Sequence, residues 1–168
     1  MATLIDPECS PAWTDGGTLL LPVAATAWPS PDAPLQLDGI AFVPKRELHV
    51  TVVGRTLGAH LHEAGLQAET LAVAATLDWR FERCGQWLRL EARTDGRRRH
   101  SIIERIALPA LATLHAWLGA RLGRQLAVPP PHVTLYTSGD DRGIGVPDAA
   151  SLARLSVRAV DAAELGLR

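Results

Sequence analysis

The stretch "ELHVTVVG" (residues 47–54) places a histidine and a threonine two positions apart inside an otherwise apolar run. About eighty residues later, "PPPHVTLYT" (residues 129–137) repeats His-Val-Thr in the same kind of setting. Short apolar runs rich in valine and bounded by proline or glycine predict strands with at least one buried face. We therefore expect two similar strands at the centre of the fold.

Alternate side chains of a strand share a face, and residues two apart lie roughly 6.5 to 7 Å from each other. His49 and Thr51 are therefore expected on one face of the first strand, with the intervening valine turned into a core. The second strand repeats this arrangement with His132 and Thr134. Tyr136 would share that face, either stacking on a nucleic-acid base as a substrate-binding residue or packing as a partly buried aromatic.

The rest of the chain predicts an α+β protein. "TLGAHLHEAG" after the first motif and the "LPALATLHAWLGARLG" segment before the second have helical spacing, and a further helix is expected through "AETLAVAAT". A buried strand is expected over 17–26 and a surface loop over 28–39. From Leu77 the apolar period becomes two, which predicts an antiparallel meander with turns at Gly85-Gln86 and Asp95-Gly96. A loop, a short helix and a last strand near "LSVRAV" complete the chain.

Length and charge narrow the function classes. A chain of 168 residues fits one domain, expected here over 1–168. Its net charge of -1 gives no field strong enough to indicate binding of long nucleic acid by overall charge alone, although a local basic cluster can still hold a small anion. Two cysteines are too few for a disulfide framework or a zinc knuckle, which indicates a reducing compartment. No apolar run approaches the roughly 20 residues of a membrane span, so we expect a cytoplasmic protein without a membrane partner.

Both motifs, their separation, the helix after the first motif and the chain length resemble the 2H phosphoesterase superfamily, which includes bacterial RNA 2′,5′-ligases and 2′,3′-cyclic nucleotide phosphodiesterases. The resemblance implies two similar lobes related by a pseudo-twofold axis, with antiparallel sheets lining a central cleft and helices outside. It also implies that His49 and His132 are the catalytic pair and that Thr51 and Thr134 hold the phosphate. The expected ligand is a nucleotide or RNA terminus bearing a cyclic phosphate, and the expected state is a monomer.

The chemistry of these residue types agrees with that assignment. Opening a cyclic phosphodiester needs one group to accept a proton from water and another to donate one to the leaving alkoxide. Two imidazoles with ordinary pKa values near 6.5 can supply both protonation states, and two hydroxyls can donate to the phosphate oxygens. No metal or cofactor is required. Which histidine is the base stays open, because a coupled pair titrates as a unit.

The sequence is compatible with several alternative functions. The same cleft can belong to a nucleotide- or RNA-binding module without turnover, to an RNA 2′,5′-ligase, or to a phosphodiesterase for another cyclic metabolite. Tyr136 and Thr137 stand where ligase-like relatives often carry an arginine, which favours hydrolysis over ligation. Lys45 and Arg46 are expected to border the cleft mouth, where Arg46 would bind substrate. The run "RRRH" (residues 97–100) either grips oligonucleotide phosphates or forms a solvated turn.

Histidines outside the motifs suggest no metal site. His60 and His62, two apart on a helix, do not face each other. His115 is expected as a packing or surface residue of the long helix.

Overall fold

The computed structural model describes residues 4–24, 26 and 32–167, so parts of the strand expected over 17–26 and of the loop expected over 28–39 lie outside the described residues. The described chain is α+β with antiparallel strands and four α-helices, as the sequence predicts. The strands are β1 (Leu4–Ile5), β2 (Ala12–Trp13), β3 (Leu19–Val23), β4 (Leu35–Leu37), β5 (Ile40–Pro44), β6 (Leu48–Val53), β7 (Phe81–Thr94), β8 (Arg97–Ala107), β9 (His132–Ser138) and β10 (Ser156–Val160). The helices are α1 (Arg55–Glu63), α2 (Gln67–Ala74), α3 (Pro109–Leu122) and α4 (Ala149–Leu155), followed by a short 3-10 helix, η1 (Ala162–Leu165).

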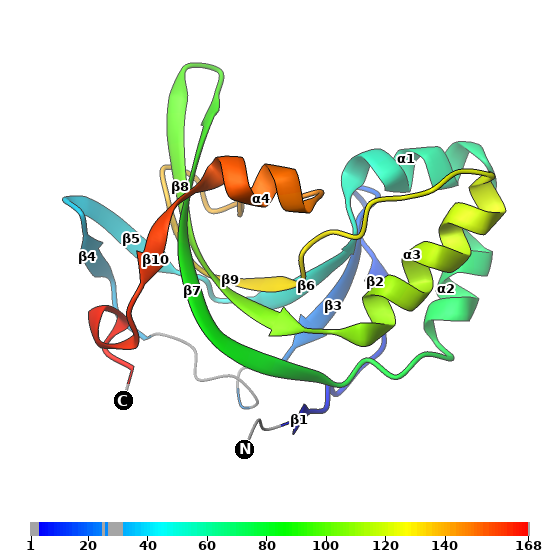
Figure 1. The fold of residues 1–168 in the computed structure, drawn as a ribbon, viewed down its shortest axis with the longest axis horizontal. Coiled ribbons are helices and arrows are strands. Elements are labelled where there is room, and N and C mark those ends of the chain that lie inside the picture. Colours follow the sequence, from blue (N-terminus) through cyan, green and yellow to red (C-terminus); the bar gives the residue numbers. More distant parts are fainter. Residues whose placement is uncertain (1–3, 25, 27–31, 168) are drawn as a thin grey trace.

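The strands form two antiparallel sheets. The larger has the order β1-β7-β8-β9-β5-β4, with β10 paired to β7, and the smaller has the order β2-β3-β6. Figure 1 shows β7 and β8 as long, curved strands, with α4 on their concave side and α1, α2 and α3 gathered at the other end of the molecule. The two sheets meet where β6 lies beside β9.

Helix ends follow the local chemistry of the sequence. Pro109 occupies the first turn of α3, where its missing N–H costs nothing, and Gly123 ends the helix in a left-handed conformation with φ of 65°. Gly65, with φ of 68°, follows α1 in the same conformation. These helices were predicted from the sequence, and α3 buries Leu111, Leu114 and Leu118 as the spacing indicates.

The β7–β8 hairpin turns at Asp95-Gly96, as predicted. Both residues have positive φ, 51° and 75°, which is the requirement of a two-residue type I′ turn.

The turn predicted at Gly85-Gln86 is wrong, because β7 runs on through these residues. The paired residues on either side are Arg83 with Ile106 and Trp87 with Glu104. β7 therefore uses two more residues than β8 over this interval, which is a bulge. Gly85 has φ of 63°, and a left-handed glycine serves a bulge as well as a turn.

Two clusters of buried apolar side chains hold the sheets and helices together. The larger unites β3, β6, β8 and β9 with α3. The smaller lies under α4, where Leu152, Ile144 and Val146 pack on Leu90 and Ile103. The short strand β4 falls within the loop expected over 28–39, which corrects that prediction. No helix in the described part of the chain combines the length and apolarity needed to cross a membrane.

Candidate active site

In both motif strands, the side chains from the histidine to the threonine point to the faces that the sequence predicts. In β6, His49 and Thr51 are partly exposed while the residues on either side of each are buried. In β9, His132 and Thr134 are partly exposed and Val133 is buried. Each strand therefore turns its valine inward and presents an imidazole and a hydroxyl on the other face.

Each motif strand also carries a bulge directly after its threonine. In the β3–β6 ladder Leu20 pairs with Thr51 and Leu19 pairs with Val53, which leaves Val52 as the extra residue. In the β8–β9 ladder Ile103 pairs with Thr134 and Ile102 pairs with Tyr136, which leaves Leu135 as the extra residue. The two motifs thus share their backbone irregularity as well as their residues.

The expectation that Tyr136 shares the face of His132 and Thr134 is wrong. The extra residue in β9 shifts the alternation by one position, because two residues of a bulged strand oppose one on its partner. Tyr136 therefore turns into the larger apolar cluster, where its side chain is only 3% exposed. It is not available to stack on a base.

Neighbouring charges act on both motif histidines. Burial holds the pKa of His49 below its usual value, and the charges of Lys45 and His132 lower it further, against the opposite influence of Glu47. Because the charge of His132 acts on His49 and β6 lies beside β9, the two imidazoles lie in one site.

His132 is similarly perturbed. Burial lowers its pKa most, a hydrogen bond to the Pro130 carbonyl raises it, and the charge of Arg105 lowers it. Nδ1 of His132 lies 2.8 Å from the Pro130 oxygen. A carbonyl only accepts, so Nδ1 carries the proton and donates, which leaves Nε2 of the neutral ring with a lone pair for proton transfer.

Arg105 is a site residue that the sequence reasoning missed. It lies directly opposite His132 in the β8–β9 ladder and so shares its face. Its Nε is buried and has no hydrogen-bond partner within the described chain. A charged pair, Glu104-Arg105, inside the apolar run "SIIERIA" was the available signal, but the neighbour of His132 depends on strand register.

The two basic residues before the first motif differ in their surroundings. Lys45, rather than Arg46, is the cation whose charge reaches His49. Arg46 is exposed, and its substrate-binding role stays a prediction.

The loop between β9 and α4, residues 139–148, borders the site from both motif strands. Lys45 Nζ donates to the carbonyl of Asp141 at 2.7 Å. Gly143 approaches Thr134 so closely that a Cβ added at position 143 would lie 3.0 Å from the threonine Oγ1. The loop therefore contacts both the lysine beside His49 and the hydroxyl beside His132.

His115 supports the bulge of β6 from behind. Its side chain is 3% exposed, and Nε2 lies 2.8 Å from the carbonyl of the extra residue, Val52. Nε2–H donates to that oxygen, which ties α3 to the residue after Thr51. His115 is therefore a buried packing residue of α3, which is one of the two roles expected from the sequence; the other was a surface residue.

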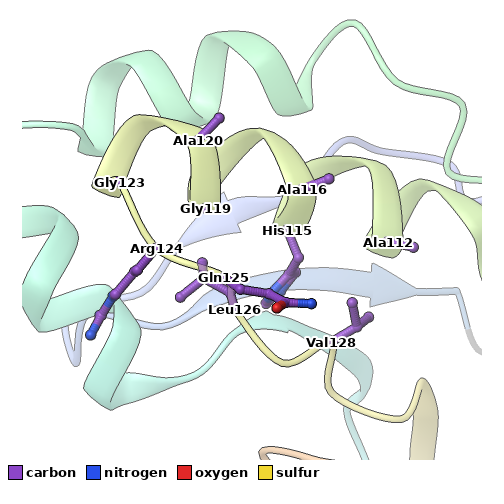
Figure 2. A pocket seen from close by; sticks show the side chains of 10 residues that line it. All are labelled: Ala112, His115, Ala116, Gly119, Ala120, Gly123, Arg124, Gln125, Leu126 and Val128. Atoms are coloured by element: carbon purple, nitrogen blue, oxygen red, sulfur yellow. The ribbon is translucent and has the colours of Figure 1, made fainter.

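A groove of about 580 Å³ lies beside His115, between α3 and the segment that follows it. Figure 2 shows His115 pointing from α3 toward the segment of Gln125 and Leu126, whereas Arg124 points away. Small side chains from α3, including Ala112 and Ala116, line the rest. None of the lining residues belongs to β6 or β9, so the groove is separate from the motif histidines.

His60 and His62 each have their own hydrogen-bond partner. His60 Nδ1 lies 2.9 Å from Arg124 Nη2, and His62 Nδ1 lies 3.1 Å from Gln67 Oε1. Over residues 4–24, 26 and 32–167, no three His, Cys, Asp or Glu side chains gather as metal ligands would.

Comparison of the chain with protein-family models, curated proteins and solved structures gave no significant match. The geometry of the two motifs is therefore the basis for assigning a function.

Proposed function

We propose that the protein is a phosphodiesterase that hydrolyses 2′,3′-cyclic phosphates, at RNA ends or on small nucleotides, without a metal ion. The observation that carries the proposal is the pair of His-x-Thr motifs on the neighbouring strands β6 and β9, each followed by the same bulge. The proposal includes the finer architecture of two similar lobes meeting at these strands. The equivalent bulges after Thr51 and Thr134 support it.

The histidines supply both proton transfers. One imidazole accepts a proton from water as the water oxygen attacks phosphorus, and the other donates a proton to the ribose oxygen that leaves. One P–O bond forms and one breaks, and solvent then restores the two protonation states. The free Nε2 of His132 suits either role, because it accepts when neutral and donates when protonated.

Four further side chains favour an anionic ligand at this place. Thr51 and Thr134 offer hydroxyl donors beside the imidazoles, and donors fixed in advance stabilise charge on the non-bridging oxygens. Lys45 and Arg105 place one cation near each histidine. The two nearby cations favour binding of an anion, and a bound anion would in turn favour the protonated form of each imidazole.

The test is incubation of the EDTA-treated protein with the four nucleoside 2′,3′-cyclic monophosphates, followed by phosphorus NMR. We expect ring opening that persists after chelation, with one phosphate position in the product. Calorimetry on the same samples separates the alternative of a binding module, which would bind a nucleotide tightly and release no product. Absence of turnover with all four nucleotides and with an RNA bearing a cyclic phosphate end would reject the proposal.

A further inference from the structure

Lys45 differs from every other strongly basic residue of the chain. Lysine and arginine together number 17, and Lys45 is the single lysine among them. The two side chains are not interchangeable, because a guanidinium is a planar fork whereas an ammonium is a compact charge with three rotatable donors on a flexible stem. The chain therefore departs from its general use of arginine four residues before His49, between β5 and β6.

The backbone of Lys45 is fixed to the second motif strand. Its N–H donates to the carbonyl of Leu135 at 2.8 Å. Leu135 is the extra residue of the β9 bulge, directly after Thr134. Because the chain after Lys45 leads into β6 while its N–H binds β9, the residue has a defined position beside both motif strands.

The ammonium of Lys45 keeps donors and charge that the protein does not use. Nζ donates to the Asp141 carbonyl at 2.7 Å, and no other side-chain hydrogen bond or ion pair of Lys45 is formed within the described residues. An ammonium has three N–H donors and no acceptor, so two donors remain for a ligand. A backbone carbonyl carries no net charge, so the positive charge of Lys45 is left without a neutralising carboxylate.

Two observations show that this charge lies where a phosphate would bind. Burial is the main cause of the lowered pKa of His49, and the charge of Lys45 lowers that pKa further. The loop that accepts from the ammonium at Asp141 also brings Gly143 against the Thr134 hydroxyl. A cation that acts on a neighbouring imidazole also acts on an anion bound by that imidazole.

We propose that Lys45 is a catalytic residue whose ammonium donates to a non-bridging oxygen of the reacting phosphate. The inference rests on the proposed function and adds a substrate contact outside the two His-x-Thr motifs. A cyclic phosphodiester is a monoanion, and attack by water with loss of a proton to a histidine adds negative charge to the oxygens on phosphorus. A cation fixed beside these oxygens stabilises the transition state more than the bound substrate, so Lys45 contributes to kcat.

The binding test is acetylation of the amine itself with sulfosuccinimidyl acetate, followed by mass spectrometry of the peptide that contains Lys45. Only the neutral amine reacts, and a phosphate that binds the ammonium keeps it protonated and covered. The ligands are adenosine 2′- and 3′-monophosphate at ten times the dissociation constant that calorimetry gives for each. At that concentration acetylation of Lys45 should slow about tenfold, while adenosine, which lacks the phosphate, should leave the rate unchanged.

Arg93→Lys provides the matched control, because it adds a second lysine at an exposed position of β7. In this variant the nucleotide should slow acetylation at Lys45 and leave the rate at position 93 unchanged. Binding of a nucleotide by calorimetry without protection of Lys45, or equal slowing at both lysines, would overturn the proposal.

Kinetics give a second readout. Lys45→Met keeps an unbranched side chain without the charge, and Arg93→Met removes one charge from the hairpin. With a nucleoside 2′,3′-cyclic monophosphate, kcat should fall about tenfold to 100-fold in Lys45→Met and stay at the wild-type value in Arg93→Met. Each protein is measured at its own optimum pH, so that a changed His49 pKa does not contribute. A wild-type kcat in Lys45→Met would overturn the proposal.

The two experiments separate this inference from the proposed function. Protection of Lys45 by the nucleotides without hydrolysis of any cyclic nucleotide by the wild type would reject the proposed function and keep Lys45 as a phosphate-binding residue. Hydrolysis by the wild type without protection of Lys45 would reject the inference and keep the proposed function. Absence of both nucleotide binding and hydrolysis would reject both.

Discussion

Gly143→Ala tests whether the Thr134 hydroxyl acts on the substrate. The new Cβ would lie 3.0 Å from Thr134 Oγ1, whereas ordinary contacts begin at 3.4 Å, so the hydroxyl must shift by a few tenths of an ångström. The backbone at Gly143 is outside the left-handed region, and the residue is exposed, so the substitution should leave the free energy of unfolding almost unchanged. Because a misplacement of about 1 Å costs on the order of 100-fold in rate, we expect kcat/KM to fall roughly threefold to tenfold.

Gly145→Ala is the matched control for this experiment. It lies in the same loop, and nothing is within 4 Å of the position that its Cβ would take. Initial rates with a nucleoside 2′,3′-cyclic monophosphate should therefore match those of the wild type.

A double-mutant cycle with Thr134→Ala locates the effect. Once the hydroxyl is gone, adding Gly143→Ala should cost nothing more, since the two changes act through one group. Equal losses for Gly143→Ala with and without the hydroxyl, or an equal loss for Gly145→Ala, would show that the substitution does not act through the Thr134 hydroxyl.

Three further predictions follow from the environments of single residues. Burial and nearby cations hold the pKa values of His49 and His132 below the usual value of about 6.5. The value of kcat/KM should therefore peak below pH 6.5 and decline as pH rises through 7. A maximum above pH 7 would contradict this. Because these pKa values are lower in the folded than in the unfolded protein, unfolding takes up protons. The free energy of unfolding, measured by denaturant titration, should therefore reach its full value above pH 6.5 and fall toward pH 5. A free energy of unfolding that does not change between these pH values would contradict this prediction. Gly58→Ala would place a Cβ 1.8 Å from the carbonyl oxygen of Gly17 and should lower the free energy of unfolding by about 1–3 kcal/mol. Equal denaturant midpoints of unfolding for this variant and Gly145→Ala would exclude such a clash.

The features that the sequence predicts well are those carried by local periodicity. The apolar alternation around His49 and His132 predicted both motif strands and their faces correctly as far as each threonine. The Asp95-Gly96 dipeptide predicted the hairpin, because few residues tolerate two successive positive φ angles.

Bulges explain the two clearest failures. Gly85 has the conformation of a turn glycine, yet it sits in a bulge inside one long strand, and only the pairing with β8 distinguishes the two cases. The extra residue Leu135 moves Tyr136 to the core side of β9, and no local pattern marks that change. Both errors arise because a ladder with a distant strand, rather than the local sequence, sets the register.

Cross-strand neighbours were likewise beyond sequence reasoning. Arg105 became a site residue because β8 pairs with β9 in a register that sets it opposite His132. Lys45 reaches His49, although the adjacent Arg46 looked equally suitable in the sequence. Tertiary packing decides which cation lies near each histidine. Adjacent residues in the sequence can differ in this respect, so the sequence alone does not predict it.

The proposed function requires His49 and His132 to act as one acid–base pair on a cyclic phosphate. The most direct measurement is the rate at which EDTA-treated wild type, His49→Ala, His132→Ala and the double variant open a nucleoside 2′,3′-cyclic monophosphate, with His62→Ala, an exposed histidine of α1, as the control. Each single variant should lose on the order of 100-fold to 10,000-fold in kcat, and the double variant should lose no more than the worse single variant, because the two groups serve one step. Wild-type rates in either single variant, or losses that multiply in the double variant, would contradict a paired mechanism.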